Sequence, residues 1–241
     1  MLSRLLMLLL PLLVLACTTP AHLPTPSTMP APPPSPAGTQ SPISFLALGD
    51  SYTIGEGAAA ADRWPVQLAA LARQQGVPLA EPDIIARTGW TTAELQAAIA
   101  ASGNQRQDYG LVSLLIGVNN QYRGQPVARY RTEFRELLAT AVRFAGGQPR
   151  HVVVLSIPDW GQTPFAADRN RAQIALEIDQ FNAVAHEECQ HADVAFVDIT
   201  PLTRAAAGDN RQFAADGLHY TGAQMSRWAE SAWAVVRPLL P

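Results

Sequence analysis

The sequence predicts an α/β domain built on an open parallel sheet, and three observations lead to this fold class. Short apolar runs alternate along the chain with longer stretches of helical character. The apolar runs are continuous and rich in Val, Ile or Leu, as expected when helices cover both faces of a parallel sheet. Polar clusters follow the ends of these runs, where open α/β sheets form their binding sites.

Five segments are expected to be strands, and five longer segments are expected to be helices. The strands are predicted at residues 43–48, 83–86, 111–116, 151–156 and 194–197. The helices are predicted at residues 64–75, 92–101, 126–145, 169–190 and 222–236. Alternation of this kind favours right-handed crossover connections between the strands.

Three of the predicted helices carry local signals of their own. Thr91 and Glu94 have the spacing of a capping box, which satisfies the backbone N–H groups at a helix start. Pro126 stands at the beginning of the third predicted helix, where a missing N–H costs nothing. The fourth predicted helix places apolar residues on one stripe, at Ile174, Ile178, Phe181 and Ala185.

The first 42 residues differ in composition from the rest of the 241-residue chain. A positive charge at Arg4 and an apolar run over 5–15 predict an export signal over 1–17. Residues 14–17 resemble a bacterial lipobox, so we expect Cys17 to be lipidated. The stretch over 18–42 is rich in Pro, Ser and Thr, which predicts a disordered, extended tether. An ordinary signal peptide that happens to contain a cysteine is the alternative.

These features predict a protein of the cell envelope, with a catalytic or binding domain over 43–241 and a lipid anchor as its only membrane contact. No transmembrane helix is expected after the signal. The net charge is −3 and no block of Lys or Arg occurs, which argues against a nucleic-acid partner. The only cysteines are Cys17 and Cys189, so a lipidated Cys17 leaves no intramolecular disulfide. We expect a monomer.

Polar clusters at the predicted strand ends contain the parts of a serine hydrolase. Ser51 follows the first strand within Gly-Asp-Ser, and Asp216 precedes His219 by three residues near the C-terminus. Serine needs a base to act as a nucleophile, and the base needs an orienting carboxylate. We therefore predict a triad of Ser51, His219 and Asp216. Turn residues at each of these positions are the structural alternative, since Gly, Asp and Ser are common in turns.

An oxyanion hole needs hydrogen-bond donors near the nucleophile. The candidates are the backbone N–H groups of Ser51 and Gly89 and the side-chain amide of Asn119. Simple turn residues are the alternative for Gly89 and Asn119. The remaining histidines show no metal-ligand spacing, so neither a metal nor a cofactor is expected. Substrate contacts are expected from the loop residues Trp90, Asn120, Tyr122 and Trp160.

With these residues in order, the chain resembles the SGNH/GDSL hydrolases over about 43–239. Ser51, Gly89, Asn119 and His219 match the family's four blocks. The resemblance implies a three-layer α/β/α sandwich with a five-stranded, flavodoxin-like parallel sheet. It also implies hydrolysis of carboxylic esters or thioesters without a metal. Two positions depart from the family pattern: Tyr52 stands where Leu is frequent, and Asn120 stands where Asp is frequent.

The predicted function is a serine esterase that favours short acyl groups, because no insertion long enough for a lipid-binding lid is evident. The loop over 160–168 is the longest candidate for a pocket wall. One alternative is a carbohydrate acetyl-esterase that acts on envelope or dietary polysaccharide. A second is a catalytically silent envelope protein that binds ligands with the same fold.

Overall fold

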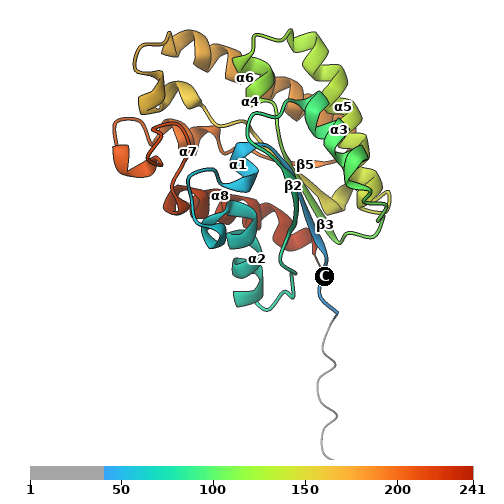
Figure 1. The fold of residues 1–241 in the computed structure, drawn as a ribbon. Helices are drawn as coiled ribbons and strands as arrows, with labels where there is room; N and C mark the ends of the chain where they lie inside the picture. The colour runs from blue at the N-terminus through green and yellow to red at the C-terminus, as the bar shows by residue number, and fades with distance from the viewer. Residues whose placement is uncertain (1–40, 241) are drawn as a thin grey trace, which may run out of the picture. The chain divides into compact units, whose positions relative to one another are not determined.

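The computed structural model describes residues 41–240. Its centre is a parallel five-stranded sheet with the strand order β2-β1-β3-β4-β5 (Figure 1). The strands are β1 (Phe45–Gly49), β2 (Asp83–Ala86), β3 (Leu111–Leu115), β4 (Val152–Leu155) and β5 (Ala195–Val197). This is the flavodoxin-like order, in which the chain turns back between β1 and β3. The predicted signal and the predicted tether up to residue 40 lie outside the described residues.

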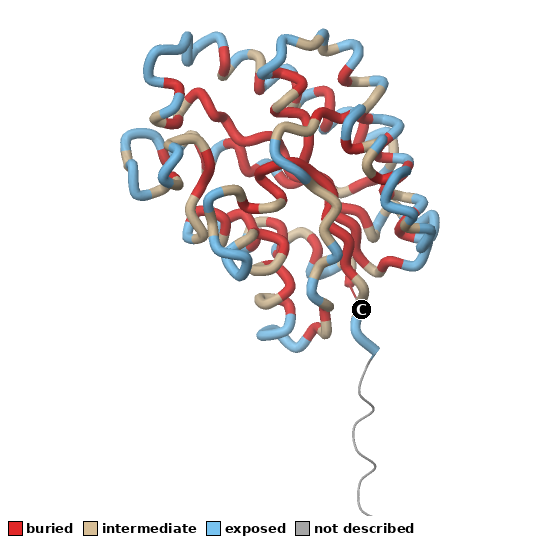
Figure 2. Tube along the Cα trace, viewed as in Figure 1, coloured by how far each residue is buried: buried red, intermediate tan, exposed pale blue. Residues whose placement is uncertain are grey.

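Continuous apolar sequence makes the central strands, because both of their faces are covered. Every residue of β1, β3 and β4 is buried. Strand β2 lies at the edge and is only partly covered, and β1 pairs with it from Leu46 opposite Asp83 to Gly49 opposite Ala86. Figure 2 shows the buried chain concentrated in the sheet and on the inner sides of the helices.

Helices cover both faces of the sheet, which gives three layers. On one face α2 (Trp64–Gln74) packs against α8 (Gly222–Val236). On the other face α5 (Val127–Phe144) lies between α3 (Thr92–Ser102) and α6 (Arg171–His191) (Figure 1). Three further α-helices are short: α1 (Ser51–Ile54), α4 (Val118–Tyr122) and α7 (Thr200–Arg204). The three-layer prediction is therefore confirmed.

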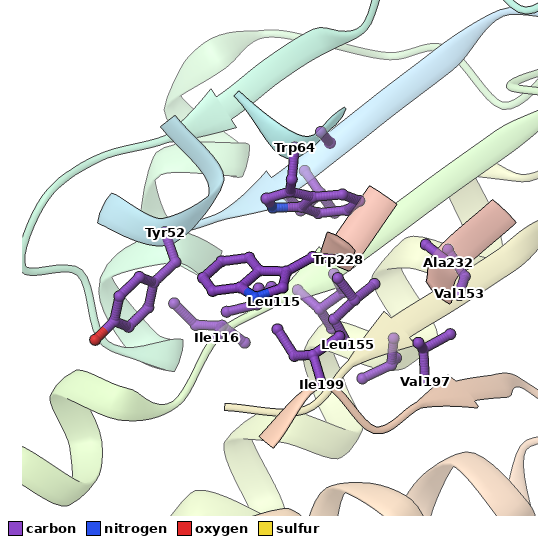
Figure 3. Packing of buried hydrophobic residues seen from close by; sticks show 14 of the residues in the cluster. Tyr52, Trp64, Leu115, Ile116, Val153, Leu155, Val197, Ile199, Trp228 and Ala232 are labelled. Carbon is purple, nitrogen blue, oxygen red and sulfur yellow. The ribbon is translucent and has the colours of Figure 1, made fainter. Parts of the chain in front are cut away.

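The core beneath α1 contains large aromatic side chains from helices far apart in sequence. Trp64 and Trp228 are fully buried, and Tyr52 packs edge-on against Trp228 with ring centroids 6.1 Å apart (Figure 3). Burial of side chains this large stabilises the fold strongly. Because Tyr52 adjoins Ser51 in the same short helix, this packing also fixes the backbone that carries Ser51.

The helix signals that the sequence predicted are present. Thr91 caps α3 through its side chain, and Glu94 completes the capping box from the third helical position. Asp50 caps α1 by accepting the Tyr52 N–H at 3.0 Å. No helix in the described part of the chain is long and apolar enough to cross a membrane.

Candidate active site

The polar clusters meet where the strand order reverses. Ser51 is the first residue of α1, directly after β1, and Asn119 lies in α4, two residues after the β3–α4 turn begins at Gly117. Strands β1 and β3 are neighbours in the sheet, so these helices start side by side at its carboxyl edge. Parallel sheets form a crevice at such a switch point, and this crevice is the natural binding site of the fold.

The turn that presents Ser51 leaves no room for a side chain at Gly49. A Cβ atom there would lie 2.1 Å from Thr53 Oγ1 and 2.5 Å from the Leu115 carbonyl oxygen. Asp50 is fully buried behind the turn. Desolvation raises the pKa of its carboxyl to about 7, although hydrogen bonds from backbone N–H groups act in the opposite direction. Asp50 shapes this turn by accepting the Tyr52 N–H.

Asp216 and His219 form a close pair at the opposite side of the crevice. The His219 Nδ1 and Asp216 Oδ2 atoms are 2.6 Å apart. Asp216 Oδ1 also accepts the backbone N–H groups of Leu218 at 2.9 Å and His219 at 3.0 Å. Partial burial acts to raise the pKa of Asp216, but these hydrogen bonds outweigh it and hold the pKa below its ordinary value. An ionised Asp216 therefore fixes the imidazole orientation.

Ser51 and His219 line one cavity of about 200 Å³ together with Gly89 and Asn119. The cavity is also lined by Tyr52, Thr88, Val118, Tyr122, Trp160, Phe165 and Leu218. Within residues 41–240 no hydrogen bond joins Ser51 Oγ to the His219 ring. Such bonds are often long without substrate and tighten when it binds.

The three expected oxyanion donors lie at this cavity with hydrogens to spare. The backbone N–H groups of Ser51 and Gly89 make no hydrogen bond within the described residues. The Asn119 amide donates one hydrogen to the Trp90 carbonyl oxygen at 2.9 Å, which leaves its second hydrogen free. Gly89 has a φ of +85°, a backbone conformation that side chains disfavour.

Two of the four expected substrate residues reach the cavity and two do not. Tyr122 and Trp160 line it, with ring centroids 5.3 Å apart. Asn120 is instead fully buried, and its Oδ1 accepts the Thr92 N–H at 3.1 Å. Trp90 is half-buried against the core and contributes only its carbonyl group to the site. Asn120 and Trp90 therefore have structural contacts in place of the expected substrate contacts.

The cavity wall contains residues that the sequence analysis did not single out by number, above all Phe165 and Leu218. Phe165 packs near Trp160 at a centroid distance of 6.2 Å and is 42% exposed. Trp160 is held by a hydrogen bond from its Nε1 to Gln121 Oε1 at 2.8 Å. Signals were available for both, because Phe165 lies in the loop over 160–168 that the sequence predicts as a pocket wall, and Leu218 lies between Asp216 and His219.

Other reactive groups lie away from this cavity. Cys189 is fully buried, and desolvation raises the pKa of its thiol to about 12, so it is an unreactive core residue. Among residues 41–240 no group of three or more His, Cys, Asp or Glu side chains could hold a metal ion.

Known structures share this fold. A crystal structure of TesA superposes with a TM-score of 0.63 and 22% identity, covering 82% of this chain and 99% of that chain. Phospholipase A1 from Streptomyces albidoflavus NA297 superposes with a TM-score of 0.62 and 20% identity, covering 81% of this chain and 100% of that chain. The acetylxylan esterase Axe2 from Geobacillus stearothermophilus superposes with a TM-score of 0.61 and 16% identity, covering 80% of this chain and 93% of that chain.

No curated protein matches the sequence at a significant level. The sequence model of the GDSL-like Lipase/Acylhydrolase family, however, matches residues 47–226, which is most of the chain and includes every residue of the cavity described above. The chain therefore belongs to this GDSL-like family of ester-bond hydrolases.

Proposed function

We propose that this protein is a serine esterase that cleaves esters of short acyl groups through Ser51, His219 and Asp216. The observation that carries the proposal is the shared cavity of Ser51 and His219, with Asp216 2.6 Å behind the imidazole. Three free hydrogen-bond donors on the same cavity support an acyl-transfer reaction, because they suit a developing oxyanion.

In the proposed reaction His219 removes the Ser51 proton while Ser51 Oγ attacks the ester carbonyl carbon. The carbonyl oxygen becomes an oxyanion that the Ser51 N–H, the Gly89 N–H and the Asn119 amide bind. His219 then protonates the leaving alcohol as the C–O bond breaks. Water, deprotonated by His219, attacks the acyl-enzyme and releases the acid, which restores Ser51 and neutral His219.

The size and lining of the cavity support a short, uncharged acyl group. A volume of about 200 Å³ is below the range of about 300–1,000 Å³ that is common for small-molecule sites. Its walls are mainly apolar, with Val118, Trp160 and Leu218 beside the nucleophile. Nothing among these wall residues offers a charge to an ionised acyl chain.

A carbohydrate acetyl-esterase is a second candidate, and one feature favours it. Tyr122 and Phe165 are 50% and 42% exposed at the cavity, and Trp160 lies against both rings. Aromatic rings of this kind can pack on the apolar face of a sugar. The similarity in fold to an acetylxylan esterase is compatible with this candidate.

The test is hydrolysis of an ester panel from acetyl to long acyl groups, with thioesters and acetylated sugars beside it. We expect short acyl esters to be preferred, and Ser51→Ala to lose about 10⁴-fold or more in kcat/KM. Ser226→Ala on α8 is the matched control, because this serine lies far from Ser51 in sequence and outside the cavity. Full activity or full fluorophosphonate labelling of Ser51→Ala would contradict the proposal and favour a different nucleophile.

Export and lipidation at Cys17 belong to the same proposal and rest on the sequence of residues 1–17 alone. We expect the expressed protein to partition with membranes and Cys17→Ser to be released from them. An unchanged membrane fraction for Cys17→Ser would rule out the lipid anchor.

A further inference from the structure

We propose that Arg123 is a positioning residue for the loop between β2 and α3, residues 87–91, which we call the Gly89 loop. By holding this loop, Arg123 allows the Gly89 N–H to bind the oxyanion. The inference rests on the proposed esterase function, and it assigns a role to a side chain outside the cavity wall. Arg123 does not line the cavity, so it acts through Gly89 and not through contact with substrate.

The guanidinium of Arg123 bridges the Gly89 loop and helix α3. Its Nη2 donates to the Gly89 carbonyl oxygen at 2.5 Å, and its Nη1 donates to Glu94 Oε1 at 3.1 Å. The planar fork of an arginine suits two such acceptors at once. One side chain thus joins the loop that carries an oxyanion donor to a rigid helix start.

Glu94 makes this connection rigid because its two oxygens have different partners. Its Oε2 accepts the Thr91 N–H at 2.8 Å as part of the capping box, while Oε1 faces Arg123. The Thr91 N–H bond lowers the pKa of Glu94 most, burial acts in the opposite direction, and the bond from Arg123 lowers it further, so that the pKa lies below its ordinary value. Glu94 therefore stays ionised and paired at neutral pH.

Arg123 also belongs to the helix that carries the second oxyanion donor. It ends α4 as its C-cap, and its backbone N–H donates to the Asn119 carbonyl oxygen at 3.1 Å. Asn119 in turn donates from its side chain to the carbonyl of Trp90, the residue after Gly89. Asn119 of α4 and its C-cap residue Arg123 thus donate hydrogen bonds to two successive carbonyl groups of the same loop, those of Trp90 and Gly89.

A turn hydrogen bond from the Trp90 N–H to the Arg87 carbonyl oxygen, at 3.2 Å, spans Gly89, but within the described residues Arg123 alone bonds the Gly89 carbonyl group. A Cβ atom at Gly89 would meet only Arg123 Nη2 within 4 Å, at 3.8 Å, so packing does not fix this position. Glycine also has the widest backbone freedom of any residue. Without Arg123, the turn bond and the bonds of Thr88 and Trp90 would remain, but no bond would hold the Gly89 carbonyl group, and the φ of +85° that orients the Gly89 N–H would be less firmly fixed.

The test compares Arg123→Met with Arg73→Met, which is a closely matched control. Arg73 also bridges a carbonyl oxygen and a glutamate, since it donates to Leu79 O at 2.9 Å and to Glu81 Oε1 at 2.6 Å. Its side chain is 40% exposed, and that of Arg123 is 45% exposed. Both substitutions remove the same type of bridge, but only Arg123→Met removes it from the Gly89 loop.

We expect Arg123→Met to lower kcat and kcat/KM equally, by about 10- to 100-fold. The reason is that the bond from the Gly89 N–H to the oxyanion, which Arg123 supports, is made in the transition state. Phosphonylation of Ser51 by a fluorophosphonate should slow by a similar factor. Arg123→Lys should recover part of the rate, since an ammonium group can satisfy one of the two acceptors. Arg73→Met should keep kcat within about twofold of the parent, and the two methionine variants should melt within a few degrees of each other.

Amide hydrogen exchange of the peptide over 87–92 provides a reading that does not depend on activity. Exchange should be faster in Arg123→Met and unchanged in Arg73→Met. Unchanged kcat together with unchanged exchange in Arg123→Met would overturn the inference, and so would an equal loss of kcat in both variants. If the parent protein hydrolysed no ester, the proposed function would fail, while the exchange comparison would still decide whether Arg123 holds the loop.

Discussion

Asn120 shows how one buried amide connects the residues behind the Gly89 loop. Its Nδ2 donates to Thr92 Oγ1 at 2.6 Å and to Gln125 Oε1 at 2.9 Å. A weaker contact of 3.4 Å leads from the same nitrogen to Glu133 Oε2 in α5. A carboxylate from α5 therefore stands next to residue 120, and an amide at this position avoids two adjacent negative charges.

We predict that Asn120→Asp destabilises the protein by roughly 1–3 kcal/mol, because it places a buried carboxylate against Glu133 and removes a donor. The double variant Asn120→Asp, Glu133→Gln should recover most of this loss. Urea denaturation at pH 7 measures both effects. Glu133→Gln alone is the control, and its loss of the exposed Arg129 partner should cost little. Strict additivity of the two single variants would show that the residues do not interact.

Neighbouring residues of α4 also show what the sequence could not predict. Successive residues of a helix point about 100° apart, so Asn119 and Asn120 face different surroundings. Asn119 lines the cavity, whereas Asn120 is buried behind it. Both asparagines follow the same strand, and residue type alone does not tell which of them faces the cavity. That choice depends on where a helix of five residues begins.

At the scale of elements, the strands and long helices could be predicted and the short helices could not. Strand β2 was predicted with its observed bounds, and the other strands differ by one or two residues at their ends. Long apolar runs and capping residues carry these signals. Helices α1, α4 and α7 have four or five residues, too few to show a helical period. Since α1 and α4 carry Ser51 and Asn119, the geometry of the site depends on elements with weak signals.

The 3₁₀ helix Trp160–Gln162 depends on an ion pair between the buried Asp159 carboxylate and the partly exposed Arg204 side chain of α7. Asp159 is fully buried and caps this turn by accepting the Gly161 N–H at 3.0 Å. Arg204 donates to the same carboxylate at 2.8 Å and also pairs with Asp179 on α6. The wall of the cavity at Trp160 is therefore anchored to two helices through one guanidinium.

We predict that Arg204→Met destabilises the protein by about 3–5 kcal/mol, because it leaves the Asp159 carboxylate buried without its partner. The variant Arg204→Met, Asp159→Asn should regain much of this stability, since no charge remains buried. The denaturant midpoint of each variant at constant m-value measures the difference. Arg211→Met provides a control, because the Arg211 pair with Asp209 is largely exposed. Equal midpoints for Arg204→Met and Arg211→Met would contradict the prediction.

At the scale of the whole molecule, two groups of carboxyls give stability opposite dependences on pH. Hydrogen bonds from Arg135 and then Arg131 lower the pKa of Glu188 to about 2, against the effect of burial. The pKa of Asp216 also lies below its ordinary value. A lowered pKa stabilises the fold above the ordinary value and loses this effect as pH falls. Asp50 behaves in the opposite way, because burial raises its pKa from 3.8 to about 7. The folded protein retains this proton, so stability falls as pH rises between these values.

We therefore predict that the parent protein is less stable at pH 8 than at pH 5, and that Asp50→Asn removes most of this difference. The span from pH 5 to the pKa of about 7 corresponds to roughly 2–3 kcal/mol for one fully buried carboxyl. Urea denaturation at both pH values measures the difference, and every other titrating group, including His151 with its lowered pKa, acts alike in the two proteins. The prediction would be contradicted if the free energy of unfolding changed equally from pH 5 to pH 8 in the parent and in Asp50→Asn. The Asp50 carboxyl would then be ionised in the folded protein across this range, with water solvating its Oδ2 atom, which has no protein partner among the described residues.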